Sequence, residues 1–178
     1  MTHRHASAVP AGARVMTRGV VFVHSCPRAV TSHVEWVLGD VLGTQVHLEW
    51  TEQPVSAGAY RAELSWTGPA GSAARMVSDL HAWGRLRLEV TEEPTASTEG
   101  ERFAATPSLG IHRAIIGAHG DIMITEERLR AAMSRARLSG QPLEIELDEL
   151  LGGAWDQELE PFRYAGENNS VRWLHHVG

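Results

Sequence analysis

Lysine is absent from this 178-residue chain, and all sixteen basic residues are arginine. The absence excludes mechanisms that need an ammonium side chain, such as Schiff-base catalysis and phosphate binding by the lysine of a P-loop. The 22 acidic residues outnumber the arginines and give a formal net charge of −6. An acidic chain of this kind is not expected to act as a general nucleic-acid binder.

Cysteine is nearly absent as well, since Cys26 is the only one. A single cysteine excludes an intramolecular disulfide and a zinc site built on several cysteines, and it fits a reducing compartment. Long hydrophobic runs are also missing. The longest, residues 20–23, has the length of a strand, whereas a membrane span needs roughly 18 apolar residues. We therefore expect a cytoplasmic protein that does not enter a membrane.

Residues 1–15 carry basic residues and no acid, but they lack the run of about 7 to 15 apolar residues that a signal peptide contains. The first strongly patterned segment begins at Met16. Residues 1–15 are therefore expected to be a disordered leader, or to result from a start codon placed too far upstream. Whether they belong to the native protein stays open.

The hydrophobic pattern of residues 16–94 predicts an α+β fold, a ferredoxin-like βαββαβ sandwich. Residues 19–24 (GVVFVH) are almost continuously apolar, which is typical of a central strand covered on both faces. Ser25 or Cys26 is expected to cap the helix that follows, and Gly43 to end it. The other expected elements are strands at residues 45–51, 60–66 and 85–91 and a helix at residues 73–83.

Alternation in these strands places apolar side chains on one face of the sheet, under the helices. Seven polar side chains are then expected on the opposite face, in water and paired across strands: His47, Glu49, Arg61, Glu63, Arg85, Arg87 and Glu89. The strand at residues 19–24 is apolar on both sides, so its far side needs a cover. We favour a later part of the chain over a second copy as that cover.

Residues 95–101 are small and polar and predict a linker. The pattern of residues 102–178 predicts a smaller α+β module, a hairpin plus helices, packed on the first domain. Within it, Thr125 is expected to cap a helix. Residues 142–151 match both a helix and a strand, and the two alternatives stay open.

Two residues at the end of the first strand are candidates for catalysis. Cys26 lies between a strand and a helix, where unpaired N–H groups lower the pKa of a thiol, and His24 lies two residues before it. No third group that would orient the histidine is evident. A small buried cysteine that fills a turn is the interpretation we favour. None of the ten histidines shows the spacing of a metal site, so no metal and no cofactor is expected.

A basic patch is predicted on the helix over residues 125–138. It consists of Arg128, Arg130, Arg135 and Arg137, in a chain that is otherwise acidic. Such a patch can bind an acidic partner helix or a phosphate group. Alternatively, it is a solvent-exposed face whose charges are balanced by neighbouring acidic residues. Trp36 lies off the apolar stripe of the first helix, and a tryptophan that is bare there marks an interface.

Four stretches resemble an actinobacterial protein family known only as a domain of unknown function: RGVVFVHSCP at 18–27, TPSLG at 106–110, ELEPFRYAGE at 158–167 and VRWLHHV at 171–177. The resemblance spans residues 16–178. It implies a stand-alone cytoplasmic protein with no assigned reaction, cofactor or catalytic residue. It also implies a location beside fatty-acid synthesis genes in some relatives. Acyl carrier protein is therefore a candidate partner, because its acidic helix would complement Arg128, Arg130 and Arg135.

We expect a non-catalytic protein- or ligand-binding module that recognises its target at the junction of the two modules or through the arginine-rich helix. A thiol-dependent enzyme that uses Cys26 is one alternative. A self-associating structural protein, such as a homodimer, is another.

Overall fold

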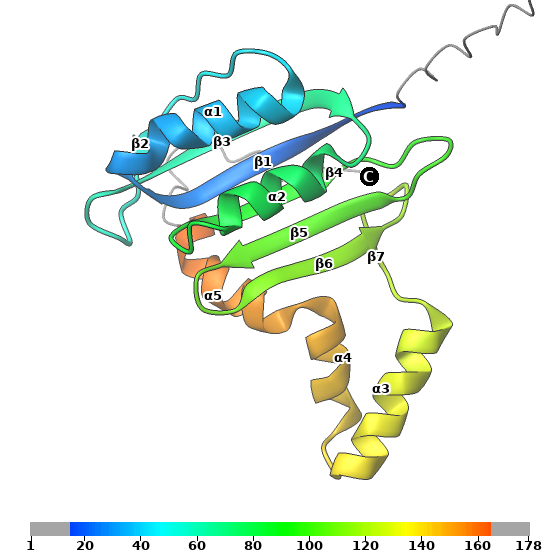
Figure 1. Ribbon diagram of the computed structural model, residues 1–178. Coiled ribbons are helices and arrows are strands. Elements are labelled where there is room, and N and C mark those ends of the chain that lie inside the picture. The colour runs from blue at the N-terminus through cyan, green and yellow to red at the C-terminus, as the bar shows by residue number, and fades with distance from the viewer. Residues whose placement is uncertain (1–14, 165–178) are drawn as a thin grey trace, which may run out of the picture.

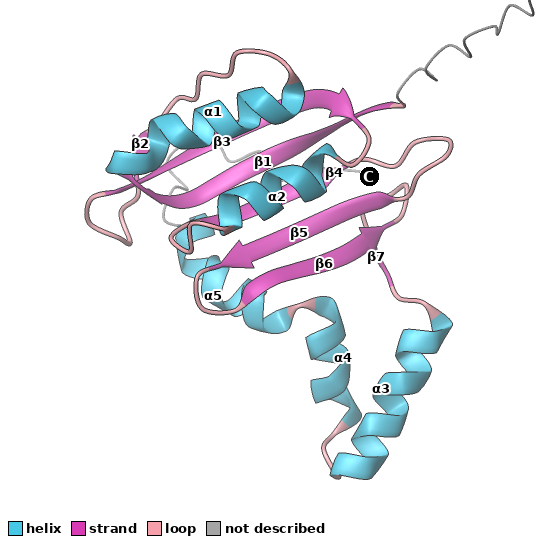
Figure 2. Cartoon of the chain, in the orientation of Figure 1, coloured by secondary structure: helices cyan, strands magenta, loops and turns pink. Residues whose placement is uncertain are grey.

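The structure is a computed structural model that describes residues 15–164, so residues 1–14 of the expected leader lie outside the described part. Within residues 15–164 the chain forms one antiparallel sheet of seven strands, in the order β2-β3-β1-β4-β5-β6-β7, together with five α-helices (Figures 1 and 2). The predicted α+β class is therefore confirmed.

Strands and helices are interspersed in the first half of the chain, whereas four consecutive strands, β4 to β7, and then three consecutive helices, α3 to α5, make up most of the rest. The first half contains β1 (Met16–Pro27), a 3-10 turn (Arg28–Val30), α1 (Thr31–Leu42), β2 (Thr51–Glu52), β3 (Ala59–Pro69), α2 (Ser72–His81) and β4 (Arg87–Glu92). The second half contains β5 (Gly100–Thr106), β6 (Gly110–Ile116), β7 (Ile122–Met123), α3 (Glu126–Ser139), α4 (Leu143–Leu151) and α5 (Gly153–Tyr164).

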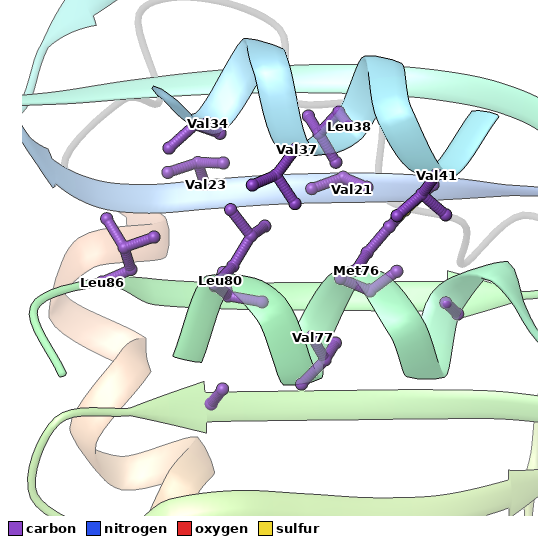
Figure 3. Close-up of a cluster of buried hydrophobic side chains, with 14 of the residues drawn as sticks. Val21, Val23, Val34, Val37, Leu38, Val41, Met76, Val77, Leu80 and Leu86 are labelled. Atoms are coloured by element: carbon purple, nitrogen blue, oxygen red, sulfur yellow. The ribbon is translucent and has the colours of Figure 1, made fainter. Parts of the chain in front are cut away.

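β1 is a central strand, as its continuous apolarity predicts, and it pairs with β3 on one side and β4 on the other. Val21 and Val23 point from β1 toward the two helices that cover this face, α1 and α2 (Figure 3). Val34 and Leu38 of α1 and Met76 and Leu80 of α2 complete this core and are essentially inaccessible to water. Burying one side chain of this size stabilises the fold by about 1.5–3 kcal/mol.

The junction of β1 and α1 differs from the expectation that Ser25 or Cys26 caps a helix. β1 continues through both residues to Pro27, because a register shift after Val23 lets the strand keep pairing with β3 and β4. A 3-10 turn then precedes α1. The other end of the helix agrees with the prediction, since Gly43 adopts the left-handed conformation at φ 68°.

The expected strand at residues 45–51 is wrong for most of its length, since only Thr51 belongs to a strand. Glu35 of α1 instead bonds to one backbone group and one side chain of this segment. Its Oε1 accepts from the backbone N–H of Leu48 at 2.9 Å and from the indole N–H of Trp50 at 3.1 Å. The apolar side chains of this segment still pack against the core, as the alternation requires.

β5, β6 and β7 extend the sheet of the first half, because β4 pairs with β5 over residues 88–92. Gly100 and Glu101, expected in a linker, lie in β5. Residues 142–151 are helical from Leu143 onward, which decides between the two alternatives. Whether residues 16–94 and 102–178 are separate domains stays a prediction.

The last three helices leave the sheet and return to it. α3 and α4 form a hairpin that projects away from the sheet (Figure 1), and α5 then lies behind the strands, on the face opposite α1 and α2. α5 contacts both β5 and β1. A later part of the chain therefore covers part of the far side of β1.

Candidate functional site

Cys26 and His24, the candidates for catalysis, do not form a pair in the structure. Cys26 is completely buried, and burial raises the pKa of its thiol to about 12. Its Sγ contacts the carbonyl oxygen of Pro27 at 3.4 Å. His24 instead bonds to Glu89, with 2.7 Å between Nε2 and Oε2. The thiol therefore stays protonated at neutral pH and has no adjacent base, whereas a nucleophile reacts as the thiolate.

Glu89 of β4 is the centre of a buried ionic cluster behind the sheet. It is only 4% exposed, although we expected it in water, because α5 covers this part of the face. Arg163 of α5 donates to both carboxylate oxygens, at 2.9 and 2.6 Å, and Arg102 of β5 donates to Oε1 at 3.0 Å. With His24, each oxygen accepts two hydrogen bonds, which fills the acceptor capacity of a carboxylate.

The electrostatics of this cluster favour the ionised carboxylate. Burial alone would raise the pKa of Glu89, but the hydrogen bonds and positive charges of His24 and Arg163 lower it well below its ordinary value. Arg163 also bonds to Asp156 at 2.7 Å. The cluster is thus closed and charge-paired, and it fastens α5 to the sheet.

A second set of contacts fastens the same helix. Glu158 of α5 accepts hydrogen bonds from Arg87, Thr106 and Ser108. Burial opposes the ionisation of Glu158, but these hydrogen bonds and the charge of Arg87 lower its pKa overall. The guanidinium of Arg87, another residue expected in water, lies 4.7 Å from the centre of the Phe162 ring.

A small hollow lies between the strands β5 to β7 and the segment where α4 ends and α5 begins. All residues that line it belong to the second predicted module, so it does not lie at the junction of the two modules, where ligand recognition was expected. It encloses about 10 Å³, which is room for roughly one water molecule, whereas pockets for small molecules hold about 300–1,000 Å³. The Nε2 atom of His112 is buried at this place without a hydrogen-bond partner among the described residues. The residues that line the hollow are Arg102, Ala104, His112, Ala114, Ile122, Leu151, Gly152 and Asp156.

The four arginines of the predicted basic patch all lie on α3 and are exposed, but they do not act as one group. Arg135 bonds to Glu146 of α4 at 2.7 Å, and Arg130 pairs with Glu126 one turn earlier on α3. Arg128 and Arg137 form no ion pair within residues 15–164. Two of the four charges therefore remain available to a partner.

The hairpin of α3 and α4 also exposes large apolar side chains. α3 buries only Ala132 and Ala136, and α4 buries only Glu146 and Leu150. Leu138, at the end of α3, is 89% exposed. The other exposed apolar residues of the hairpin are Leu129, Met133, Ile145 and Leu151, each 40–46% exposed. This surface combines apolar groups with unpaired charge, a composition typical of interfaces.

Trp36, the remaining predicted contact residue, lies on α1 and is 68% exposed. The helix that carries it, α1, covers one face of the sheet, whereas the hairpin projects away from the sheet (Figure 1). The structure therefore does not join Trp36 to the arginines of α3.

Sequence reasoning missed Glu35, Gln53 and Arg163 as positioning residues. Gln53 is 2% exposed and donates from Nε2 to the carbonyl oxygens of His24 and Phe162, which links β1 to α5. Nothing in the spacing of the sequence indicates contacts of this range. The same holds for Glu35, which lies 13 residues before Leu48 and is recognised as its acceptor only once the path of the chain is known.

Two kinds of site are absent from the part of the chain that the structure describes. None of its helices is long and apolar enough to cross a membrane. None of its His, Cys, Asp and Glu side chains gather in a group of three or more that would hold a metal ion.

The fold and its surfaces define an α+β protein with one antiparallel sheet and a projecting helical hairpin. Residues 20–176 match the model of the family described as Protein of unknown function (DUF3145), and the chain belongs to that family. This confirms the resemblance to a family of unknown function. No curated protein and no solved structure matches the chain.

Proposed function

We propose that this protein is a non-catalytic protein-binding module whose contact element is the hairpin of α3 and α4. The observation that carries the proposal is the exposure of the hairpin: its large apolar side chains are exposed beside arginines that have no ion-pair partner among the described residues. Contact with a protein would bury the apolar side chains and pair the arginines with acidic groups.

The spacing on α3 supports contact along one side of the helix. Leu129, Met133 and Arg137 follow one another at intervals of one turn, so the two apolar side chains and one of the arginines without an ion pair lie along the same side of the helix. Methionine and arginine are enriched at interfaces. The methionine side chain is flexible and adapts its shape to the partner, and the arginine side chain forms paired hydrogen bonds with carboxylates. The partner surface is therefore acidic and partly apolar.

Acyl carrier protein is one candidate of this class, since its helix is acidic. The support from this chain is the pair of unsatisfied charges, Arg128 and Arg137, on an exposed helix. If this candidate is correct, reversal of both charges abolishes binding to purified acyl carrier protein, whereas Arg61→Glu, on β3, leaves it unchanged.

We also propose that residues 16–92 form a ferredoxin-like unit to which β5, β6 and β7 are added. The support is the strand order β2-β3-β1-β4 together with the position of α1 and α2 on one face of the sheet. β2 is reduced to two residues, and the segment before it bonds to Glu35 through the backbone N–H of Leu48 and the indole N–H of Trp50. The binding hairpin is then an addition to a widespread scaffold.

A photo-crosslinking amino acid at position 138 tests the proposed function. The full chain carrying it is expressed in the cells that naturally produce the protein, irradiated, and its adducts are identified by mass spectrometry. We expect an adduct with one identified protein. The control carries the same amino acid at position 55, because Val55 is also exposed but lies outside the hairpin. Equal labelling from positions 138 and 55, or no adduct from either, overturns the proposal.

A further inference from the structure

We infer that the surface recognised by α3 is α4 of a second copy of this chain, so that two hairpins pack about a twofold axis. This inference rests on the proposed function and names its partner. It follows from the distribution of charge and apolar groups over the two helices of the hairpin.

The two helices carry opposite charge. α3 contains four arginines and two glutamates, whereas α4 contains four acidic residues and no basic one. One ion pair, between Arg135 and Glu146, connects them. Arg128 and Arg137 of α3 and Glu144, Asp148 and Glu149 of α4 form no ion pair within the described part of the chain. The hairpin therefore presents a positive helix beside a negative one.

This arrangement disfavours an acidic partner that covers the whole hairpin. Such a partner would pair with α3 but would also face the carboxylates of α4, and like charges brought together across an interface cost several kcal/mol. A twofold axis that runs between the two hairpins solves this problem when it places α3 of each copy against α4 of the other. Opposite charges then meet twice, as a self-complementary interface requires.

The apolar side chains are also distributed over both helices. α3 exposes Leu129, Met133 and Leu138, and α4 exposes Ile145 and Leu151. Ile145 and Glu149 lie one turn apart on α4, in the same way that apolar and charged residues adjoin on α3. Each helix can therefore supply both kinds of contact to the helix it meets.

The position of the hairpin leaves space for a second copy. α3 and α4 project from the sheet, and no other helix or strand of residues 15–164 covers their outer sides (Figure 1). Two such hairpins side by side form a four-helix arrangement, in which each helix buries the apolar groups of its neighbours. The sheet and its core need not change when the copies meet.

A charge-swap experiment tests this inference on the full-length chain. One variant makes α3 acidic (Arg128→Glu with Arg137→Glu) and the other makes α4 basic (Glu144→Arg with Glu149→Arg). All four residues are exposed and lack an ion pair among the described residues, so each variant is expected to keep the circular dichroism spectrum and Tm of the wild type.

Sedimentation velocity over a concentration series gives the dissociation constant of the dimer. We expect the wild type to dimerise in the micromolar range and more weakly in high salt, and each variant alone to dimerise at least about tenfold more weakly. An equimolar mixture of the two variants restores dimerisation, because the acidic hairpin of one meets the basic hairpin of the other. Native mass spectrometry identifies the mixed dimer by its mass.

Three outcomes overturn the inference. The first is a wild type that stays monomeric at about 100 times the micromolar dissociation constant expected here. The others are variants that dimerise as the wild type does and a mixture that forms no mixed dimer. The proposed function fails separately. An adduct between position 138 and a different protein, with a monomeric wild type, refutes the twofold hairpin contact but supports protein binding by the hairpin. Absence of any adduct at position 138 refutes both.

Discussion

Arg163 of α5 and Glu89 of β4 form a two-point ion pair behind the sheet, although 74 residues separate them in the chain. Both side chains are less than one-tenth exposed. A buried charge that loses its partner remains desolvated and uncompensated, so the pair makes the position of α5 obligatory once the sheet has formed. The contact between α5 and the central strands therefore depends on a few charged atoms.

Replacement of Glu89 by glutamine is expected to destabilise the protein strongly. The substitution keeps the size of the side chain but removes the buried negative charge that His24, Arg102 and Arg163 share. Asp156 still pairs with Arg163, but breaking a buried ion pair costs about 3–5 kcal/mol. Urea unfolding at pH 7 measures the loss. The control is Glu126→Gln, which breaks an exposed pair with Arg130 and is expected to cost less than about 0.5 kcal/mol. Similar losses in the two variants would contradict the role given to Glu89.

Acid is expected to weaken the fold through the same carboxylate. The pKa of Glu89 is lower in the folded state than in the unfolded state, so the unfolded chain binds a proton first as the pH falls. The contribution of Glu89 is therefore complete above pH 4.5, the ordinary value of its pKa, and declines below it. Unfolding free energies measured between pH 7 and 3 test this. The decline is expected to be shallower in Glu89→Gln, and an equal slope would refute the prediction.

His112 is expected to add a dependence on pH nearer to neutrality. Burial and the charge of Arg128 lower the pKa of His112 in the folded state below 6.5, its ordinary value in the unfolded state. At a pH between the pKa of the folded state and that of the unfolded state, His112 is therefore protonated mainly in the unfolded chain. Stability therefore falls as the pH drops below about 6.5. His112→Phe removes the titration and also the unpaired Nε2 atom. The difference in Tm between pH 7.5 and 5.5 should shrink in this variant, and an unchanged difference would contradict the prediction.

Gly19→Ala is expected to disrupt the centre of the sheet. A Cβ atom at this position would lie 1.9 Å from the carbonyl oxygen of Thr91 and 2.7 Å from the ring of Trp66. The first contact is with backbone of the neighbouring strand, so β1 and β4 must separate, and overpacking of this kind costs about 1–3 kcal/mol or more. Thermal unfolding followed by circular dichroism measures the effect. Ser65→Ala, at an exposed position on β3, serves as the matched control.

Glu35 can be tested by a pair of substitutions. Glu35→Ala leaves the N–H groups of Leu48 and Trp50 without their acceptor, at a cost of about 1–3 kcal/mol. Glu35→Gln keeps a carbonyl oxygen at the same place and is expected to lose much less. Amide hydrogen exchange at Leu48 reports the hydrogen bond directly. Equally fast exchange in both variants would mean that the carboxylate does not hold this segment.

The order of the elements could largely be predicted from the sequence, because each element carries its own signal. The apolar run GVVFVH marks the central strand, and glycines mark helix ends such as Gly43. The segment at residues 45–51 shows the limit of this approach. Its alternation correctly places side chains toward the core, but alternation does not reveal whether the backbone has a strand to pair with.

The buried charges could not be predicted for a different reason. Alternation assigned Glu89 correctly to the face away from α1 and α2, but the same pattern is compatible with water or with another helix on that face. The answer depends on where α5 lies, and that is decided by contacts such as those of Arg163 and Gln53, which are distant in sequence. Likewise, the four arginines of α3 lie close together in sequence. Only the structure shows that Arg130 and Arg135 form ion pairs, whereas Arg128 and Arg137 form none within the described residues.

The complete burial of Cys26 has a practical consequence for chemical labelling. A maleimide needs an accessible thiolate, and the native thiol is neither accessible nor ionised at neutral pH. No lysine side chain competes for the reagent either, since the chain has none. A fluorophore attached after Leu138→Cys would thus sit at one defined place on the hairpin, and its self-quenching would report directly how close the tips of two molecules come.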